Sequence, residues 1–285
     1  SPTADALTVD WGKTLTEADL TKQIKNNTGN GTITFGKKLP STKLSESAFK
    51  RSKNKLKVTA KITYADGSSH TVDIPVTVRK PLAFEHAPQG SNNTVTVGDK
   101  LKQPSDYITL KNNSGNKVKP EEVKWYGGTP NSSTIGRFDK TVRVNYKDGS
   151  RKDTTVTFNV KPKTPVIETD LNGRAKIQNQ KVVVNVGTGF IPKATNTVTL
   201  YDANGNAIGS TTEIKDGKAT ITVDNGIPAG NVYAVTNSSY NNHRDKITRS
   251  FNLSSDRSEN HQATEDKEKP TLTANDATAE VGKDL

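Results

Sequence analysis

Alternating apolar and polar residues mark residues 55–78 as two β-strands joined by a tight turn. Every second residue is apolar from Leu56 along the first arm, and again along the second arm up to Val78. This period of two predicts strands with one buried face and one solvent face. Asp66-Gly67 between the arms predicts a hairpin turn, because glycine accepts a positive φ. Pro75 has no backbone N–H, so we expect the second arm to lie at a sheet edge or a bulge.

The same hairpin recurs at residues 140–160. Its turn motif, Tyr146-x-Asp148-Gly149, follows Tyr64-x-Asp66-Gly67 at a distance of 146 − 64 = 82 residues. A second matching pair, Val9 and Val95 with their neighbours, lies 95 − 9 = 86 residues apart. Repetition of one unit predicts tandem domains, and the two distances differ by the length of an insertion or deletion in a loop.

Short helical turns are predicted between the strands. Thr16 and Ser45 are each followed by an acidic residue and a short apolar stretch, which is the pattern of a capped helix start. Residues 103–108 are the counterpart of the first turn in the second copy. The predicted fold is therefore all-β with one or two short helical turns.

Proline and composition changes divide the chain into five segments. Pro81 and Pro162 follow the hairpins beside basic residues and predict short, stiff junctions. Several strands separated by Asn-Gly and Asp-Gly turns predict a β-sandwich after the second junction. A polar stretch without an apolar period then predicts a flexible linker, followed by residues that match the start of a repeat. We expect β domains at 1–80 and 81–162, a β-sandwich at 163–254, a flexible linker at 255–269, and the start of a further repeat at 270–285.

Composition favours several small domains over one large core. Hydrophobic residues make up 30% of the 285 residues, and cysteine is absent, which excludes disulfides and thiolate chemistry. No apolar run is long enough to cross a membrane. We therefore expect no membrane insertion in this segment.

The net charge of +11 is unevenly distributed. Residues 1–80 carry 14 basic and 7 acidic groups, whereas residues 255–285 carry 4 basic and 8 acidic groups. The lysines alternate along strands and do not cluster with stacking aromatics, which argues against nucleic acid. Lysines in this pattern solvate outer faces and protect strand edges from pairing. The alternative is attraction to anionic wall polymers.

The hairpin motif resembles the Rib/alpha-like repeat of Gram-positive surface proteins, whose copies carry Tyr-Pro-Asp-Gly and a later Val-x-Val. Ala65 and Lys147 replace the proline here, so both copies are atypical. Residues 164–254 are similar to bacterial immunoglobulin-like modules through the run at 198–205. The resemblance implies tandem Ig-like and Rib-like β-sandwich domains in an elongated array. It also implies a secreted, cell-wall-anchored protein of the bacterial surface, of the kind that serves adhesion, biofilm formation and virulence.

No set of residues predicts an enzyme, a metal or a cofactor. The four histidines are far apart in sequence, and Ser47-x-x-Lys50 lacks the companion motifs of serine acylases. Residues 202–206 resemble half of a calcium loop, but Asn-Gly between strands already explains them as a turn. The segment is therefore expected to be a non-catalytic stalk or spacer that projects a distal adhesive region. In the alternative, the domains themselves are an adhesin.

The candidate ligand-binding surface consists of Trp125, Tyr126, Lys57 and Lys61. Trp125 and Tyr126 precede two glycines, so they are either an exposed platform for sugar or peptide or a core anchor at a strand end; we favour the core. For the adhesin alternative the expected partners are a host extracellular-matrix protein or a cell-wall polymer. The chain is expected to be a monomer.

Overall fold

A computed structural model describes residues 1–268, and nearly all of its regular structure is β-strand. The chain forms two compact units. One unit comprises residues 1–91, 102–129 and 140–156. The other comprises residues 92–101, 130–139 and the chain from Thr157 through Glu268. The further repeat predicted at 270–285 lies outside the described residues.

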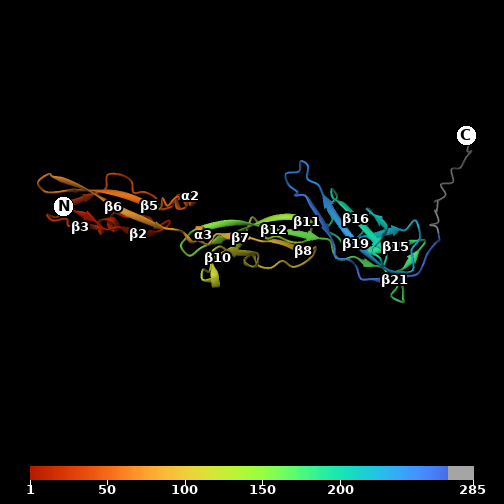
Figure 1. The fold of residues 1–285 in the computed structure, drawn as a ribbon. Coiled ribbons are helices and arrows are strands. Elements are labelled where there is room, and N and C mark those ends of the chain that lie inside the picture. Colours follow the sequence, from red (N-terminus) through yellow and green to blue (C-terminus); the bar gives the residue numbers. More distant parts are fainter. Residues whose placement is uncertain (269–285) are drawn as a thin grey trace, which may run out of the picture. The chain divides into compact units, whose positions relative to one another are not determined.

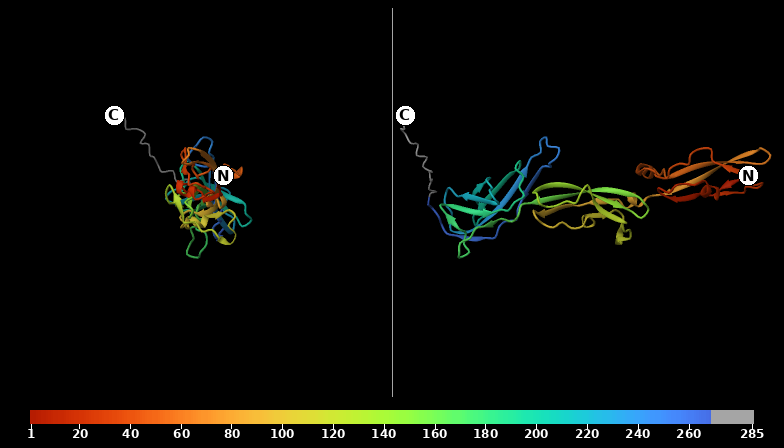
Figure 2. Two further views of the ribbon diagram at one scale, coloured as in Figure 1. Left: turned by 90° about the vertical axis from the view of Figure 1, so that its left-hand side faces the viewer. Right: turned by 180° about the vertical axis from the view of Figure 1, so that it is seen from behind.

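The first repeat (residues 1–80) is built on the predicted hairpin, which is orange in Figures 1 and 2. Its two arms pair antiparallel, and the turn closes through a hydrogen bond from the Tyr64 N–H to the Ser68 carbonyl, 2.9 Å long. A four-stranded sheet has the order β2-β6-β5-β4, in which β2 runs parallel to β6. The elements are β1 (Thr3–Ala4), β2 (Leu7–Asp10), α1 (Glu17–Thr21), β3 (Ile24–Lys25), β4 (Thr32–Thr34), α2 (Glu46–Lys50), β5 (Lys55–Thr63) and β6 (Ser69–Arg79).

The apolar set of this hairpin forms one core, as the alternation predicts. Val58 and Ala60 of β5 lie beside Ile74 and Val76 of β6, and all are buried while their neighbours along the strands face water. Leu20 of α1 completes the cluster. Both predicted helix caps are confirmed, since the hydroxyls of Thr16 and Ser45 accept the N–H groups of Asp19 and Ala48.

The position of β6 corrects the prediction made from Pro75. β6 is not an edge strand, because β5 pairs with one side of it and β2 with the other. The parallel pairing with β2 begins only at Val76, opposite Leu7, one residue after the proline. Pro75 therefore lies where β6 has a partner strand on one side only, so its missing N–H costs no ladder bond to β2.

The second repeat (residues 81–162) has the same sheet arrangement. Its sheet order is β10-β11-β12-β8, and β8 runs parallel to β12 as β2 does to β6. The segment predicted as a helix start is a 3₁₀ turn, η1. The elements are α3 (Leu82–Glu85), β7 (Pro88–Gly90), β8 (Asn92–Thr96), η1 (Pro104–Tyr107), β9 (Ile108–Leu110), η2 (Ser114–Asn116), β10 (Glu122–Tyr126), β11 (Gly136–Asn145) and β12 (Arg151–Lys161).

Matching hydrogen bonds show where the two repeats differ in length. The Thr42 hydroxyl donates to the Lys13 carbonyl, and the Ser132 hydroxyl donates to the Asp99 carbonyl. Because 132 − 42 = 90 and the hairpins are 82 apart, the second repeat lacks eight residues between this bond and its hairpin. Helix α2 lies in this interval of the first repeat, so it has no counterpart in the second.

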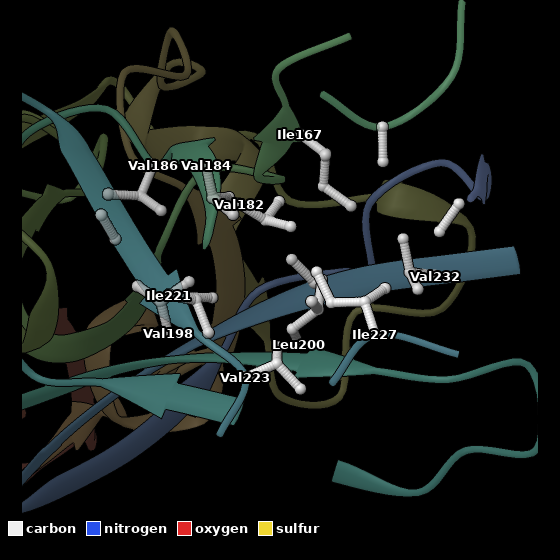
Figure 3. Close-up of a cluster of buried hydrophobic side chains, with 14 residues drawn as sticks. Ile167, Val182, Val184, Val186, Val198, Leu200, Ile221, Val223, Ile227 and Val232 are labelled. Atoms are coloured by element: carbon white, nitrogen blue, oxygen red, sulfur yellow. The ribbon is translucent and has the colours of Figure 1, made fainter. Parts of the chain in front are cut away.

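The third segment (residues 163–268) contains two sheets that enclose one apolar core. One sheet joins β13-β15-β14 with β18, and the other joins β17-β16-β19-β20 with β21. Val182 and Val184 of β15 lie together with Val198 and Leu200 of β16 in the core (Figure 3). The strands are β13 (Val166–Ile167), β14 (Ile177–Gln178), β15 (Lys181–Asn185), β16 (Thr195–Tyr201), β17 (Ala207–Thr211), β18 (Lys218–Thr222), β19 (Gly230–Tyr240), β20 (Phe251–Ser254) and β21 (His261–Ala263).

The described part of the predicted linker is not a linker but part of this third segment. β21 pairs antiparallel with β19, and Ala263 is buried in the core. Before it, Ser255 and Ser258 are buried; the Ser255 hydroxyl accepts the N–H of Thr236, and the Ser258 hydroxyl accepts that of Ala234. These serine hydroxyls act as backbone partners for β19, so a polar sequence without an apolar period still joins the sheet.

Candidate functional site

In the second repeat, the Tyr-x-Asp-Gly turn fixes the segment that begins the repeat. Tyr146 is buried, and its hydroxyl donates to the His86 carbonyl over 2.5 Å. The Asp148 carboxylate accepts the N–H of Ser150 and also the N–H of Leu82, the first residue of α3. Gly149 follows with φ of +81°, which a side chain would disfavour. Burial raises the pKa of the Tyr146 phenol to about 12.

In the first repeat, the same motif makes fewer contacts. Asp66 accepts the N–H and the hydroxyl of Ser68, and the hydroxyl bond lowers the pKa of this carboxyl. Gly67 again has a positive φ, +85°. Tyr64 is only half-buried, in contrast to Tyr146. In both copies these residues form the turn, which agrees with a structural role for the motif.

Helix α3 also contacts the first repeat through an aromatic cluster that sequence reasoning missed. The Phe84 ring lies 6.1 Å from the ring of Trp11 and 5.9 Å from that of Phe49, both in edge-to-face geometry. The Trp11 indole N–H donates to the Leu44 carbonyl over 2.8 Å, which fixes the ring. Phe49 lies on α2, the helix that only the first repeat has. The segment between the repeats is thus held by contacts on both sides.

Trp125 and Tyr126 do not form one aromatic platform. Trp125 is partly buried, and its ring centroid lies 5.9 Å from that of Tyr107. Tyr126 is 51% exposed, and the Arg143 guanidinium lies 3.6 Å from its ring centroid. Arg143 also makes two hydrogen bonds to the Asp153 carboxylate, of 2.9 and 3.0 Å. Tyr126 therefore carries a cation–π contact on a surface where the cation is already paired.

Lys57 and Lys61 lie on β5, in a different sheet from the two aromatic residues of β10. Both lysines line a groove of about 540 Å³ whose opposite wall is the segment after β4. This wall adds two further lysines, Lys37 and Lys38. The residues that line the groove are Phe35, Gly36, Lys37, Lys38, Leu39, Pro40, Lys57, Val58, Thr59 and Lys61.

The residues that resemble half of a calcium loop form a β-turn. The Asp202 carboxylate accepts the N–H groups of Asn204 and Asn206, as in a turn, and these bonds lower its pKa. Within residues 1–268, no three histidine or acidic side chains come together where they could hold a metal ion. The helices in this part of the chain are all too short to span a bilayer.

The shared parallel strand pair, the shared hairpin turn and the shared hydroxyl-to-carbonyl bond define a protein built from tandem copies of one small β module. Comparison with known proteins identifies the module. A family model for the Rib domain matches residues 1–80 and again residues 83–162. These matches cover more than half of the chain, so the chain belongs to the Rib domain family.

Individual proteins and solved structures resemble this chain over the following parts of its length. The C protein alpha-antigen of Streptococcus agalactiae is 30% identical over 187 residues, which are 63% of this chain and 17% of that protein. A solved Rib structure from Streptococcus pyogenes is 26% identical and covers 28% of this chain and 98% of the solved one, with a TM-score of 0.24. The BSP domain of a biofilm associated protein is 16% identical over 75% of this chain and 43% of its own, with a TM-score of 0.23.

Proposed function

We propose that this segment is a non-catalytic spacer in a protein of the Gram-positive cell surface. The observation that carries this proposal is the double attachment of α3. Its N–H groups bind the Asp148 carboxylate and the Ser150 hydroxyl, while its Phe84 contacts Trp11 and Phe49. A junction held on both sides resists bending, which is what a spacer needs from a tandem array.

The remaining expectations belong to the same proposal. The domain boundaries lie near residues 80 and 163, the chain is a secreted and wall-anchored monomer, and it holds no cofactor. Its match spans about a sixth of the curated relative's length, and the proposal assigns ligand binding to a distal region of the whole protein. The segment's own task is to set the distance to that region.

Small-angle X-ray scattering on the chain tests the spacer role. A compact globule of 285 residues would have a radius of gyration of about 19 Å. We expect a much larger value, and we expect Phe84→Ala to broaden the distribution of dimensions without unfolding the chain. Leu171→Ala, which removes a fully exposed side chain, is the matched control. A radius of gyration near that of the globule would refute the proposal.

The lysine-lined groove favours a second role, in which the domains themselves adhere. The ligands expected from sequence are a host matrix protein or an anionic wall polymer. The groove favours the polymer, because four lysines line one concave surface.

A further inference from the structure

We propose that the groove of the first repeat, lined by Lys37, Lys38, Lys57 and Lys61, binds a linear phosphodiester-linked polyol. This inference rests on the proposed surface location and does not depend on the spacer role. The four lysines come from two walls, the strand β5 and the loop that follows β4. All four side chains are exposed.

The groove exists because the pairing of β4 with β5 stops early. The last pair is Thr34 with Lys61, and the chain after Thr34 then leaves the edge of β5. In the second repeat the corresponding ladder continues for two more pairs, to Tyr126 opposite Thr141. The shorter ladder leaves Thr59, the counterpart of Thr141, without a partner strand on this side, beside the groove that Lys57 and Lys61 also line.

The second repeat shows which residues stand at the positions of the four groove lysines in a module of the same fold. Ile33 pairs with Ile62, and Val123 pairs with Val144, so residues on this side of the sheet correspond at 123 − 33 = 90. By this offset, Gly127 and Gly128 stand where the first repeat has its two loop lysines. By the hairpin offset of 82, Asp139 stands in place of Lys57 and Arg143 in place of Lys61. The basic groove is therefore a property of one repeat and not of the module.

The spacing of the lysines favours a chain over a single anion. Lys57 and Lys61 are four residues apart on one strand, which separates their Cα atoms by about 13 Å. One small anion would have to draw several ammonium groups together against their mutual repulsion. A polymer with a negative charge in each repeating unit pairs with each group where it lies. Among residues 1–268, the ion pair given for these four lysines is that of Lys57 with Asp73, 3.6 Å apart, and it leaves a net positive groove.

The lining also fits a phosphodiester chain with short hydrocarbon links. Apolar groups of Phe35, Leu39, Pro40 and Val58 make up the rest of the surface, together with Gly36. Thr59 is the one neutral polar side chain among the lining residues, and its hydroxyl already donates to Asp73 over 2.6 Å. Ammonium groups are hydrogen-bond donors, and a phosphodiester chain offers a charged acceptor to each of them. The short hydrocarbon links of such a chain can lie against the apolar part of the lining.

Titration of the whole chain with fluorescently labelled poly(glycerol phosphate) tests the proposal. We expect saturable binding that weakens as salt rises, and shifts of the backbone amide signals of residues 34–38 and 57–61 in the NMR spectrum. The double variant Lys37→Gly with Lys38→Gly introduces the residues of the second repeat and should weaken binding at least tenfold. The control, Lys100→Gln with Lys102→Gln, removes two exposed lysines of the second repeat and should change binding less than twofold.

Four results would overturn the proposal. They are absence of binding, equal weakening by the two double variants, tighter binding of heparin, and tighter binding of poly-glutamate. Equal weakening would mean attraction by net charge alone. Tighter heparin binding would assign the groove to a sulfated sugar, and tighter poly-glutamate binding would assign it to an acidic peptide. The amide shifts locate the ligand without any variant, and the scattering experiment reports on the spacer role independently.

Discussion

Replacing Tyr146 by phenylalanine should destabilise the second repeat far more than Tyr64→Phe destabilises the first. The Tyr146 hydroxyl is buried and donates to the His86 carbonyl over 2.5 Å, whereas Tyr64 is half-buried. Tyr146→Phe leaves that carbonyl without its donor, which costs about 1–3 kcal/mol. Tyr64→Phe should cost less than about 0.5 kcal/mol, as substitutions near a surface usually do.

The same substitution should remove a loss of stability at high pH. The Tyr146 pKa is about 12 in the folded chain and 10.0 without the protein environment. A raised pKa favours the protonated folded state below pH 10, and this advantage is lost as the pH rises from 10 to 12. With 1.36 kcal/mol per pKa unit, the loss is at most about 2.7 kcal/mol. Tyr146→Phe should lack this loss.

The two tryptophans allow each repeat to be followed separately. Urea unfolding is measured by fluorescence, with Trp125 as the reporter in a Trp11→Phe background and with Trp11 as the reporter in a Trp125→Phe background. Each tyrosine variant is compared with its own background. Equal effects of the two tyrosine substitutions, or an unchanged pH profile in Tyr146→Phe, would refute the assigned role of the buried hydroxyl.

Two further substitutions test local geometry. A Cβ at Gly90 would lie 1.8 Å from the Thr155 carbonyl oxygen, so Gly90→Ala should cost about 1–3 kcal/mol in urea unfolding, whereas Gly36→Ala meets no neighbouring atom and should be close to neutral. Hydrogen bonds from the Lys193 ammonium and from backbone N–H groups lower the pKa of Asp245, so its contribution to stability is present above pH 4 and is lost as the pH falls. Asp245→Asn should therefore flatten the acid limb of the stability profile, and an unchanged limb would contradict this assignment.

The sequence predicts those features that depend on neighbouring residues. The hairpins follow from a period of two beside Asp-Gly, and the caps follow from Thr16 and Ser45, because each needs only contacts within a few residues. The surroundings of Pro75 depend on where a strand more than sixty residues away begins to pair, and local rules contain no such information. The serines of residues 255–258 resemble a linker because their hydroxyls replace backbone partners and leave no apolar period.

The candidate site was predictable only in part. Lys57 and Lys61 were selected because they alternate along a strand, and the structure places both in the groove. Lys37 and Lys38 were missed, because they line the groove only as a result of the ladder ending at Thr34, after which the chain leaves the edge of β5. Phe84 was missed for a related reason: its partners come from the turn after β2 and from helix α2, both in the preceding repeat. The spacing of apolar residues predicts strands, but no local pattern in the sequence predicts which distant segments a loop residue or a short helix will contact.

In each repeat, the parallel pairing of the second strand with the last one, β2 with β6 and β8 with β12, has a mechanical consequence. In the first repeat, β2 lies near the beginning and β6 at the end of the module, and the two run in the same direction side by side. Tension on the two ends would slide these strands past one another, so their hydrogen bonds share the load and must rupture together. The rate of unfolding under force then depends on this shared rupture, which is much slower than opening the bonds one by one.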